Sequence, residues 1–203
     1  MADLLDPVTP VARAALPTRF GEFEVCVFHV DGVATDELAL VHGSLDTEAP
    51  PLVRLHSECI TGDVLGSLRC DCGEQLTTSL ALIAEADAGV LLYLHQEGRG
   101  IGLANKIRAY ALQDRGLDTV DANLALGLPV DRREYASAAA ILRHLGILRL
   151  RLLTNNPLKQ RALEQHGVVV VERVPLVVPP NHVNGEYLRT KADRMGHLLA
   201  FEH

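Results

Sequence analysis

Three of the four cysteines in this 203-residue chain lie close together in the sequence. Cys59 is followed by ten other residues and then by Cys70, and Cys72 comes two positions later. Thiolates bind zinc strongly, and a structural zinc site normally has four protein ligands. Three thiols without a fourth ligand nearby predict a zinc ion with one open position. Water bound there would be available as hydroxide near neutral pH, as in a catalytic site.

Two other interpretations of these cysteines are less favourable. Buried or unreactive thiols are disfavoured, because Cys70 and Cys72 flank Asp71 on a turn where neither helical nor strand periodicity requires them. A disulfide between two such close residues would be strained, since bridged residues need a specific separation. A structural zinc site with His56 as the fourth ligand remains open as an alternative.

Two further segments could bind phosphate. Residues 96–102 (QEGRGIG) lie between a predicted strand and a predicted helix, where glycines let backbone N–H groups approach an anion and Arg99 could add a bidentate contact. The segment matches neither the P-loop nor the dinucleotide motif, and an ordinary tight turn explains it equally well. Thr154 and Lys159 flank a predicted helix start at the carboxyl end of a strand, the edge where open α/β sheets bind ligands. A capped helix with a solvated lysine is the alternative.

The composition indicates a globular protein of the cytoplasm. Hydrophobic residues make up 48% of the chain, and the formal net charge of −7 argues against nucleic-acid binding, although a few local cations could hold a small anion. The N-terminus lacks a signal-peptide pattern, and no apolar stretch reaches membrane-spanning length, so no membrane partner is expected. Cysteines used as thiolates suit a reducing compartment. Cys26, in a predicted strand, is expected to be a small buried hydrophobic residue.

The predicted fold class is α/β, with a mixed sheet, parallel strand–helix units and a β-rich N-terminal part. Residues 1–15 are expected to form a flexible leader, and residues 16–203 a single catalytic domain without repeats or linkers. Strands are predicted at 22–30, 37–43, 52–56, 89–95, 149–154 and 168–171. Helices are predicted at 73–86, 103–115, 134–145, 157–166 and 185–199, with irregular structure over 118–135.

Several motifs occur in a fixed order along the chain. They are RLHSECITGD at 54–63, SLRCDCG at 67–73, QEGRGIGL at 96–103, KIRAYALQD at 106–114, LLTNNP at 152–157, VERVPL at 171–176 and YLxTKxxxMGH at 187–197. Together they resemble the GTP cyclohydrolase II family over residues 16–199. One departure is His95, where many members carry arginine. The dihydroxybutanone-phosphate synthase domain that some members carry is not expected in this chain.

The resemblance implies a zinc-dependent enzyme that opens the imidazole ring of GTP. C8 would leave as formate and the terminal phosphates as pyrophosphate, giving a diamino-ribosylamino-pyrimidinone phosphate in the first step of riboflavin biosynthesis. The family pattern also implies one zinc ion on Cys59, Cys70 and Cys72, magnesium bridging the triphosphate, and a homodimer. A partial enzyme that stops at the formamidopyrimidine nucleotide, and a non-catalytic module that binds zinc or a nucleotide, are the alternatives.

The resemblance also assigns roles to individual residues. Tyr110 matches a tyrosine of the ring-opening steps, Arg133 an arginine proposed as nucleophile on the α-phosphorus, and Asp131 its proton acceptor. Because a guanidinium is essentially always protonated, Arg133 could instead stabilise charge on the phosphate. The implied GTP contacts are Arg54, Leu55, His56, Ser57, Glu58, Gln75, Glu97, Gly98, Arg99, Thr119, Thr154 and Lys159.

Overall fold

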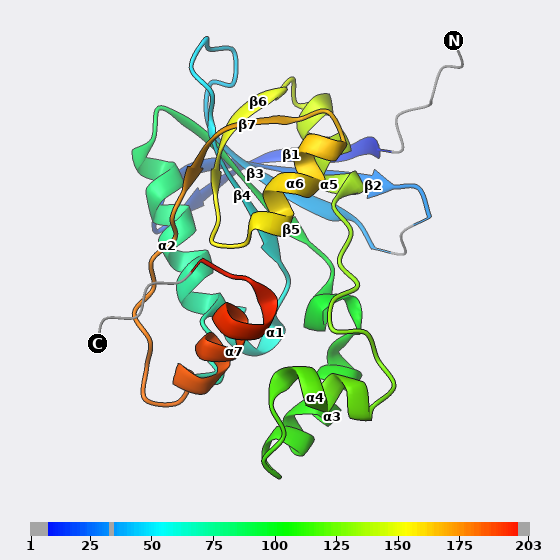
Figure 1. The fold of residues 1–203 in the computed structure, drawn as a ribbon. Helices are drawn as coiled ribbons and strands as arrows, with labels where there is room; N and C mark the ends of the chain where they lie inside the picture. The colour runs from blue at the N-terminus through cyan, green and yellow to red at the C-terminus, as the bar shows by residue number, and fades with distance from the viewer. Residues whose placement is uncertain (1–7, 33–34, 199–203) are drawn as a thin grey trace.

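The computed structural model describes residues 8–32 and 35–198 of the chain. Its centre is a seven-stranded sheet with the order β1-β2-β3-β5-β4-β6-β7 (Figure 1). The strands are β1 (Val8–Thr18), β2 (Gly21–Val30), β3 (Glu37–Gly43), β4 (Leu52–Ser57), β5 (Ala88–Leu94), β6 (Arg149–Leu153) and β7 (Val169–Val174). The helices are α1 (Ile60–Asp63), α2 (Cys72–Glu85), α3 (Leu103–Gln113), α4 (Thr119–Ala125), α5 (Ala136–His144), α6 (Pro157–Gln165) and α7 (Gly185–Met195), with a 3-10 turn at Glu97–Gly100. The mixed α/β prediction is confirmed.

The N-terminal half of the sheet is antiparallel. The predicted hairpin is confirmed, because β2 and β3 pair with Cys26 opposite Ala39. Alternate side chains of β2 face one side of the sheet, where Cys26 and Phe28 are buried, as period-two strand geometry requires, while Phe23 is buried in the cluster on the opposite side. The expectation for Cys26 is therefore confirmed.

Strand β1 corrects the prediction of a leader over residues 1–15. From Val8 onward the chain is an edge strand that pairs with β2 to the end at Thr18, while residues 1–7 lie outside the described range. Two features of the sequence prevented the prediction of this strand. Its side chains are mostly exposed, so no apolar alternation marks it, and Pro10 and Pro17 resemble strand breakers. An edge strand tolerates proline because only one of its sides pairs with the sheet.

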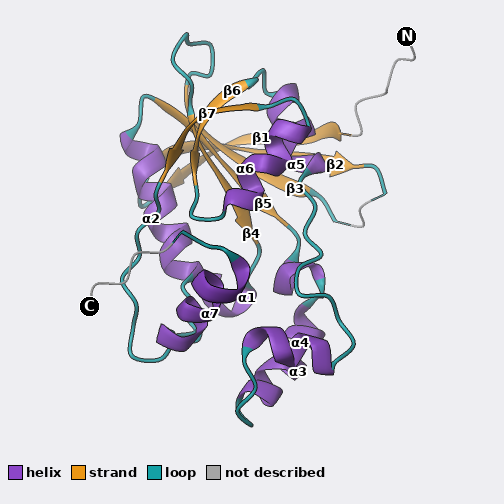
Figure 2. Cartoon of the chain, in the orientation of Figure 1, coloured by secondary structure: helices purple, strands orange, loops and turns teal. Residues whose placement is uncertain are grey.

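The C-terminal half of the sheet is parallel, with β4 paired to β5 and to β6, and β6 paired to β7. Strands β4 and β5 are buried almost throughout. The continuous apolar sequence of β5 predicts this burial, whereas β4 is buried although it carries Arg54 and His56. Helices α5 and α6 contribute to the core on one face of the sheet, and α2 packs on the other through Ile83. Figure 2 shows α1, α3, α4 and α7 gathered beyond the carboxyl ends of the parallel strands.

The other predicted helices are found near their predicted ranges. Helix α6 begins as expected, with the Asn156 side chain accepting a hydrogen bond from the Leu158 N–H and Pro157 in the first turn. Helix α4 was wrongly predicted as irregular, although its signal is present, because Asp118 caps it by accepting from two backbone N–H groups. Over residues 8–32 and 35–198, none of the helices has the length and apolar character needed to cross a membrane.

Candidate functional site

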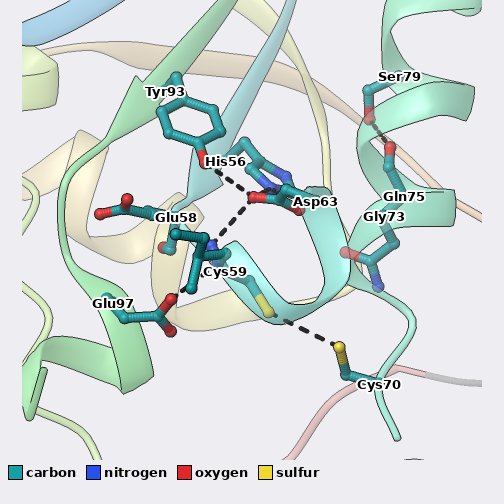
Figure 3. Close-up of polar contacts among 12 residues, drawn as sticks. His56, Glu58, Cys59, Asp63, Cys70, Gly73, Gln75, Ser79, Tyr93 and Glu97 are labelled. Carbon is teal, nitrogen blue, oxygen red and sulfur yellow. Dashed lines mark hydrogen bonds and ion pairs between the residues drawn. The ribbon is translucent and has the colours of Figure 1, made fainter. Parts of the chain in front are cut away.

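The three predicted thiols converge at the carboxyl end of β4. Their sulfur atoms lie within 4.8 Å of one another, and Cys59 Sγ is 3.6 Å from Cys70 Sγ without a disulfide (Figure 3). Cys59 immediately precedes α1, and Cys72 is the first residue of α2. A Cβ atom on Gly62 would lie 2.9 Å from Cys70 Sγ, so only glycine lets α1 pack this closely against the thiols. This compact sulfur set fits a zinc ion.

No fourth protein ligand joins this cluster within the part of the chain that the structure describes. His56, the candidate in the structural-zinc alternative, is engaged elsewhere, because its Nε2 lies 3.0 Å from each carboxylate oxygen of Asp63. The Lys106 ammonium group approaches instead, 3.0 Å from Cys59 Sγ and 2.8 Å from Glu97 Oε1. The cluster therefore offers three thiols and a neighbouring cation, and its thiol set is consistent with an open zinc site.

A buried carboxylate anchors the first thiol. Asp63 accepts hydrogen bonds from the Cys59 N–H at 3.0 Å and the Tyr93 hydroxyl at 2.9 Å, as well as from His56 (Figure 3). Burial lowers the pKa of His56 despite the opposing effect of Asp63, so the imidazole is neutral and Nε2–H is the donor. The ring stacks on Tyr93 at 5.5 Å. Asp63 thereby ties α1 and Cys59 to β4 and β5.

Beside the thiols lies a pocket to which residues from many parts of the chain contribute. It collects every residue predicted for the site except Leu55 and Asp131. The predicted residues that line it, besides the thiols, are Arg54, His56, Ser57, Glu58, Gln75, Glu97, Gly98, Arg99, Tyr110, Thr119, Arg133, Thr154 and Lys159. Glu58, Glu97 and Thr154 follow the carboxyl ends of β4, β5 and β6, where an α/β sheet is expected to bind its ligand.

The two remaining residues, Leu55 and Asp131, do not line the pocket but contact residues that do. The Leu55 side chain is fully buried in the core, and its carbonyl accepts a hydrogen bond from Lys159 Nζ at 2.7 Å. Asp131 accepts two hydrogen bonds from the Arg133 guanidinium, with Oδ1 2.9 Å from Nε and Oδ2 2.5 Å from Nη2. Both residues therefore position a pocket cation.

The charges in the pocket are unbalanced. Lys106, Arg133 and Lys191 pair with Glu97, Asp131 and Asp71 respectively. Three other cations in the pocket have no carboxylate partner in the described part of the chain, namely Arg54, Arg99 and Lys159. Arg54 Nε and Arg99 Nη1 are buried without any hydrogen-bond partner. Since unpaired buried charges are costly, this group is suited to bind an anion.

The phenol of Tyr110 points to proton chemistry. Burial raises its pKa to about 12, although nearby Lys106, with Nζ 5.9 Å from the ring centroid, acts in the opposite direction. The group is therefore protonated at neutral pH and can donate a proton or a hydrogen bond into the pocket.

Four titratable residues of the pocket were not predicted, namely Lys106, Tyr187, Lys191 and His197. The i,i+4 spacing of Lys106 with Tyr110, and of Tyr187 with Lys191, places each pair on one helix face and was an available signal. Burial, reinforced by Lys191, lowers the pKa of His197 to about 3, so this imidazole is neutral. Nothing in the local sequence of α7 indicated that it lies against the thiols.

The glycine-rich loop is a tight turn that also faces the pocket. Gly98, Gly100 and Gly102 have φ values of 62°, 84° and 83°. Arg99 also has a φ of 62°, and no other non-glycine residue in the described ranges has a positive φ. A left-handed arginine is strained, and such strain is often found at functional sites. The loop therefore holds a cation in the pocket at a cost in backbone energy.

We expect Arg99→Gly to separate stability from binding. Glycine relieves the left-handed strain, so the free energy of unfolding should stay within about 1 kcal/mol of wild type. Loss of the guanidinium should weaken the binding of inorganic pyrophosphate about tenfold. Urea unfolding and calorimetric titration measure the two effects. Arg99→Ala is the matched control, which should bind equally weakly but be less stable than the glycine variant. Unchanged pyrophosphate affinity in both would show that Arg99 does not contact the anion.

Fold and site together define a class of protein. This is an α/β protein whose parallel strands end at a cluster of three thiols that could hold a metal, beside a pocket with unpaired cations and a protonated tyrosine. Such a combination suits a metal-dependent enzyme acting on a small phosphorylated substrate.

Comparison with known proteins identifies the family. The sequence model for GTP cyclohydrolase II matches residues 9–175. GTP cyclohydrolase-2 of Picrophilus torridus is 52% identical over 188 residues, covering 93% of this chain and 97% of that protein. GTP cyclohydrolase-2 of Histophilus somni is 54% identical over 189 residues, covering 93% and 88%. The chain belongs to the GTP cyclohydrolase II family, and it is an enzyme of that type.

Two other matches differ more in length or structure. Riboflavin biosynthesis protein RibBA of Salinispora tropica is 56% identical over 190 residues, but the chain spans only 48% of its length. The crystal structure of RibBX, a two-domain 3,4-dihydroxy-2-butanone 4-phosphate synthase from A. baumannii, aligns with a TM-score of 0.46 and 24% identity, over 85% of this chain and 41% of that one.

Proposed function

We propose that this protein hydrolyses GTP in riboflavin biosynthesis, opening the imidazole ring and releasing formate and pyrophosphate. The observation that supports this proposal is that three convergent thiols and three unpaired cations line one pocket. The thiols suit a metal that acts on the base, and the cations suit a triphosphate. The family and its named members support the same substrate.

The three thiols are proposed to hold one zinc ion. When bound, zinc supplies an activated water near neutral pH for attack on a ring carbon. The chain contributes the surrounding groups. Lys106 lies against Cys59 and offsets part of the negative charge of the thiolates, and Glu97 holds Lys106 in place. Glu97 also accepts from the Ile60 N–H at 2.7 Å, which joins the glycine loop to α1.

The triphosphate is proposed to lie among Arg54, Arg99 and Lys159. Burial holds the pKa of Lys159 well below its ordinary range, with Arg54 and Arg133 adding to the effect. A bound anion would favour the charged lysine. Magnesium is proposed to accompany the triphosphate, because it prefers phosphate oxygens and water to an all-protein cage.

Arg133 is proposed to stabilise charge on the phosphate rather than to act as a nucleophile. Burial disfavours its charge, yet Tyr135 and Asp131 keep its pKa above the ordinary range. Asp131 binds the guanidinium at both Nε and Nη2, which orients it and keeps it protonated. A permanently protonated guanidinium can stabilise developing negative charge but cannot attack phosphorus.

Tyr110 is proposed to deliver a proton during ring opening. Tyr110→Phe should reduce formate release by about 10²-fold to 10³-fold, the range of general acid–base catalysis, and leave KM for GTP within about threefold. Steady-state assays of formate release measure both constants. A Tyr110→Phe enzyme with wild-type kcat would remove Tyr110 from the mechanism.

The proposed function is tested by incubating zinc- and magnesium-loaded protein with GTP and following formate and pyrophosphate together by mass spectrometry. Equal release of both, with the diamino-ribosylamino-pyrimidinone phosphate, is the expected result. Pyrophosphate without formate would instead support the partial enzyme. Folded, zinc-loaded protein that released neither would leave a binding module as the explanation.

A further inference from the structure

A continuous series of hydrogen bonds connects α7 to the sheet beneath the pocket. Lys191 Nζ donates to Asp71 Oδ1 at 2.6 Å, and Gln75 Nε2 donates to Asp71 Oδ2 at 2.5 Å. Arg54 Nη2 donates to Gln75 Oε1 at 2.6 Å, and Arg54 Nη1 donates to the Leu153 carbonyl at 3.0 Å. We call Lys191, Asp71, Gln75 and Arg54 the relay. It joins residues from α7, the thiol-bearing turn, α2 and β4.

Asp71 differs from the other members of the relay. Lys191, Gln75 and Arg54 line the pocket, whereas Asp71 does not, and its exposed fraction is 2%. It lies between Cys70 and Cys72 in the sequence and immediately precedes α2. Each of its two oxygens accepts from one donor, one from Lys191 and one from Gln75. Asp71 is thus placed to act on a ligand only through its neighbours.

The orientation of the Gln75 amide decides where Arg54 points. A glutamine amide has a donor end and an acceptor end, and its orientation is set by its hydrogen-bond partners. The Asp71 carboxylate can only accept, so it draws the NH2 group of Gln75 towards itself and turns the amide oxygen towards Arg54. That oxygen, with the Leu153 carbonyl, holds the guanidinium in one position.

We propose that Asp71 is a positioning residue that orients Gln75 and, through it, aims Arg54 at the anion. The inference deepens the proposed function and rests on it, since the anion would be the triphosphate of the substrate. One carboxylate would then control two parts of the site, the turn that carries Cys70 and Cys72 and the cation that faces the phosphates. Lys191 balances the charge of Asp71 from α7.

Asp71→Asn distinguishes this role from a simple charge effect, because the two predict opposite signs. Removing a negative charge beside a cationic pocket should strengthen anion binding by electrostatics alone. The relay predicts the reverse. Asparagine has one oxygen, so it cannot accept from Lys191 and Gln75 as two separate carboxylate oxygens do. The Gln75 amide can turn its oxygen towards the NH2 group of the introduced asparagine. Its own NH2 group then faces the Arg54 guanidinium, and two hydrogen-bond donors oppose each other. Pyrophosphate binding should therefore weaken about tenfold, the loss of one hydrogen bond to a charged group.

The experiment titrates inorganic pyrophosphate into zinc-loaded protein by calorimetry, with zinc content and melting temperature recorded for each variant. Glu74→Gln is the matched control, since Glu74 is an exposed carboxylate in the first turn of α2. It should bind pyrophosphate as tightly as wild type or slightly more tightly. Asp71→Asn binding that equals or exceeds that of Glu74→Gln would overturn the relay.

A double-mutant cycle with Gln75→Leu tests whether Asp71 acts through Gln75. In that background Asp71→Asn should no longer weaken pyrophosphate binding, because there is no amide left to misorient. If Asp71→Asn weakened pyrophosphate binding equally in the wild-type and Gln75→Leu backgrounds, the proposal would be refuted. This test holds even if Asp71→Asn lowers stability, because that effect is present in both backgrounds. Failure of wild-type protein to bind pyrophosphate would instead contradict the proposed function.

Discussion

Replacing Cys59 or Cys70 with serine is expected to abolish zinc binding and to reduce formate release by about 10³-fold or more. A catalytic metal ion contributes several kcal/mol to the stabilisation of charge in the transition state of hydrolysis. Each 1.4 kcal/mol of lost stabilisation lowers the reaction rate about tenfold. Serine keeps the size of the side chain but is not a thiolate ligand. The measurements are elemental analysis of the purified variant and mass spectrometry of formate.

The fate of the fold separates a catalytic zinc from a structural one. Since Cys59 and Cys72 are already held by α1, α2 and the Asp63 hydrogen bonds, the serine variants should remain folded while activity is lost. Cys26→Ser is the control for removing a buried thiol, because Cys26 lies in β2 and not in the thiol cluster. Variants that unfold when zinc is lost, with wild-type activity in the residual folded fraction, would instead indicate a structural site.

Asp63→Asn is expected to lower the free energy of unfolding by about 3 kcal/mol, because it disrupts several buried hydrogen bonds to a charged acceptor. The carboxylate accepts from His56, Tyr93 and the Cys59 N–H, and its side chain is only 2% exposed. Both oxygen positions lie 3.0 Å from His56 Nε2, so in either orientation the asparagine NH2 group faces the Nε2–H donor. Denaturant unfolding, followed by circular dichroism, measures the change.

Asp114→Asn is the control, because Asp114 is an exposed carboxylate paired with Arg69. Its loss should cost less than about 1 kcal/mol, as is usual for a surface ion pair. The Asp63 variant should also release zinc more readily to a colorimetric chelator, since Cys59 loses its backbone anchor. Equal stability of the two variants would show that Asp63 does not hold the site together.

Much of the site could be predicted because its signals are local. The spacing of Cys59, Cys70 and Cys72 indicated a metal site, and the structure brings their sulfur atoms together. Gly98 and Arg99 were identified from the glycine-rich loop, and both line the pocket. The apolar sequence of β5 and the Asn156-Pro157 helix start similarly identified the strand and the helix that frame it.

Other features carry no local signal. Strand β1 is held to β2 by backbone hydrogen bonds, and its exposed, proline-containing sequence resembles a disordered segment. Leu55 lies among residues predicted to contact the substrate, but strand alternation turns its side chain into the core. Asp63 and Asp71 resemble ordinary polar loop residues in the sequence. Their importance depends on donors that arrive from other strands and helices.

The sequence by itself therefore determined most of the elements, the thiol cluster and the family of this protein. Each of these depends on residue types at short spacing along the chain, and such patterns are visible without knowledge of the tertiary structure. Only the tertiary structure decided how charge is distributed in the pocket. Lys191 meets Asp71 across 120 residues, and Lys159 meets the Leu55 carbonyl across 104. Such contacts follow from the strand order and from helix packing against the sheet, which no local pattern specifies.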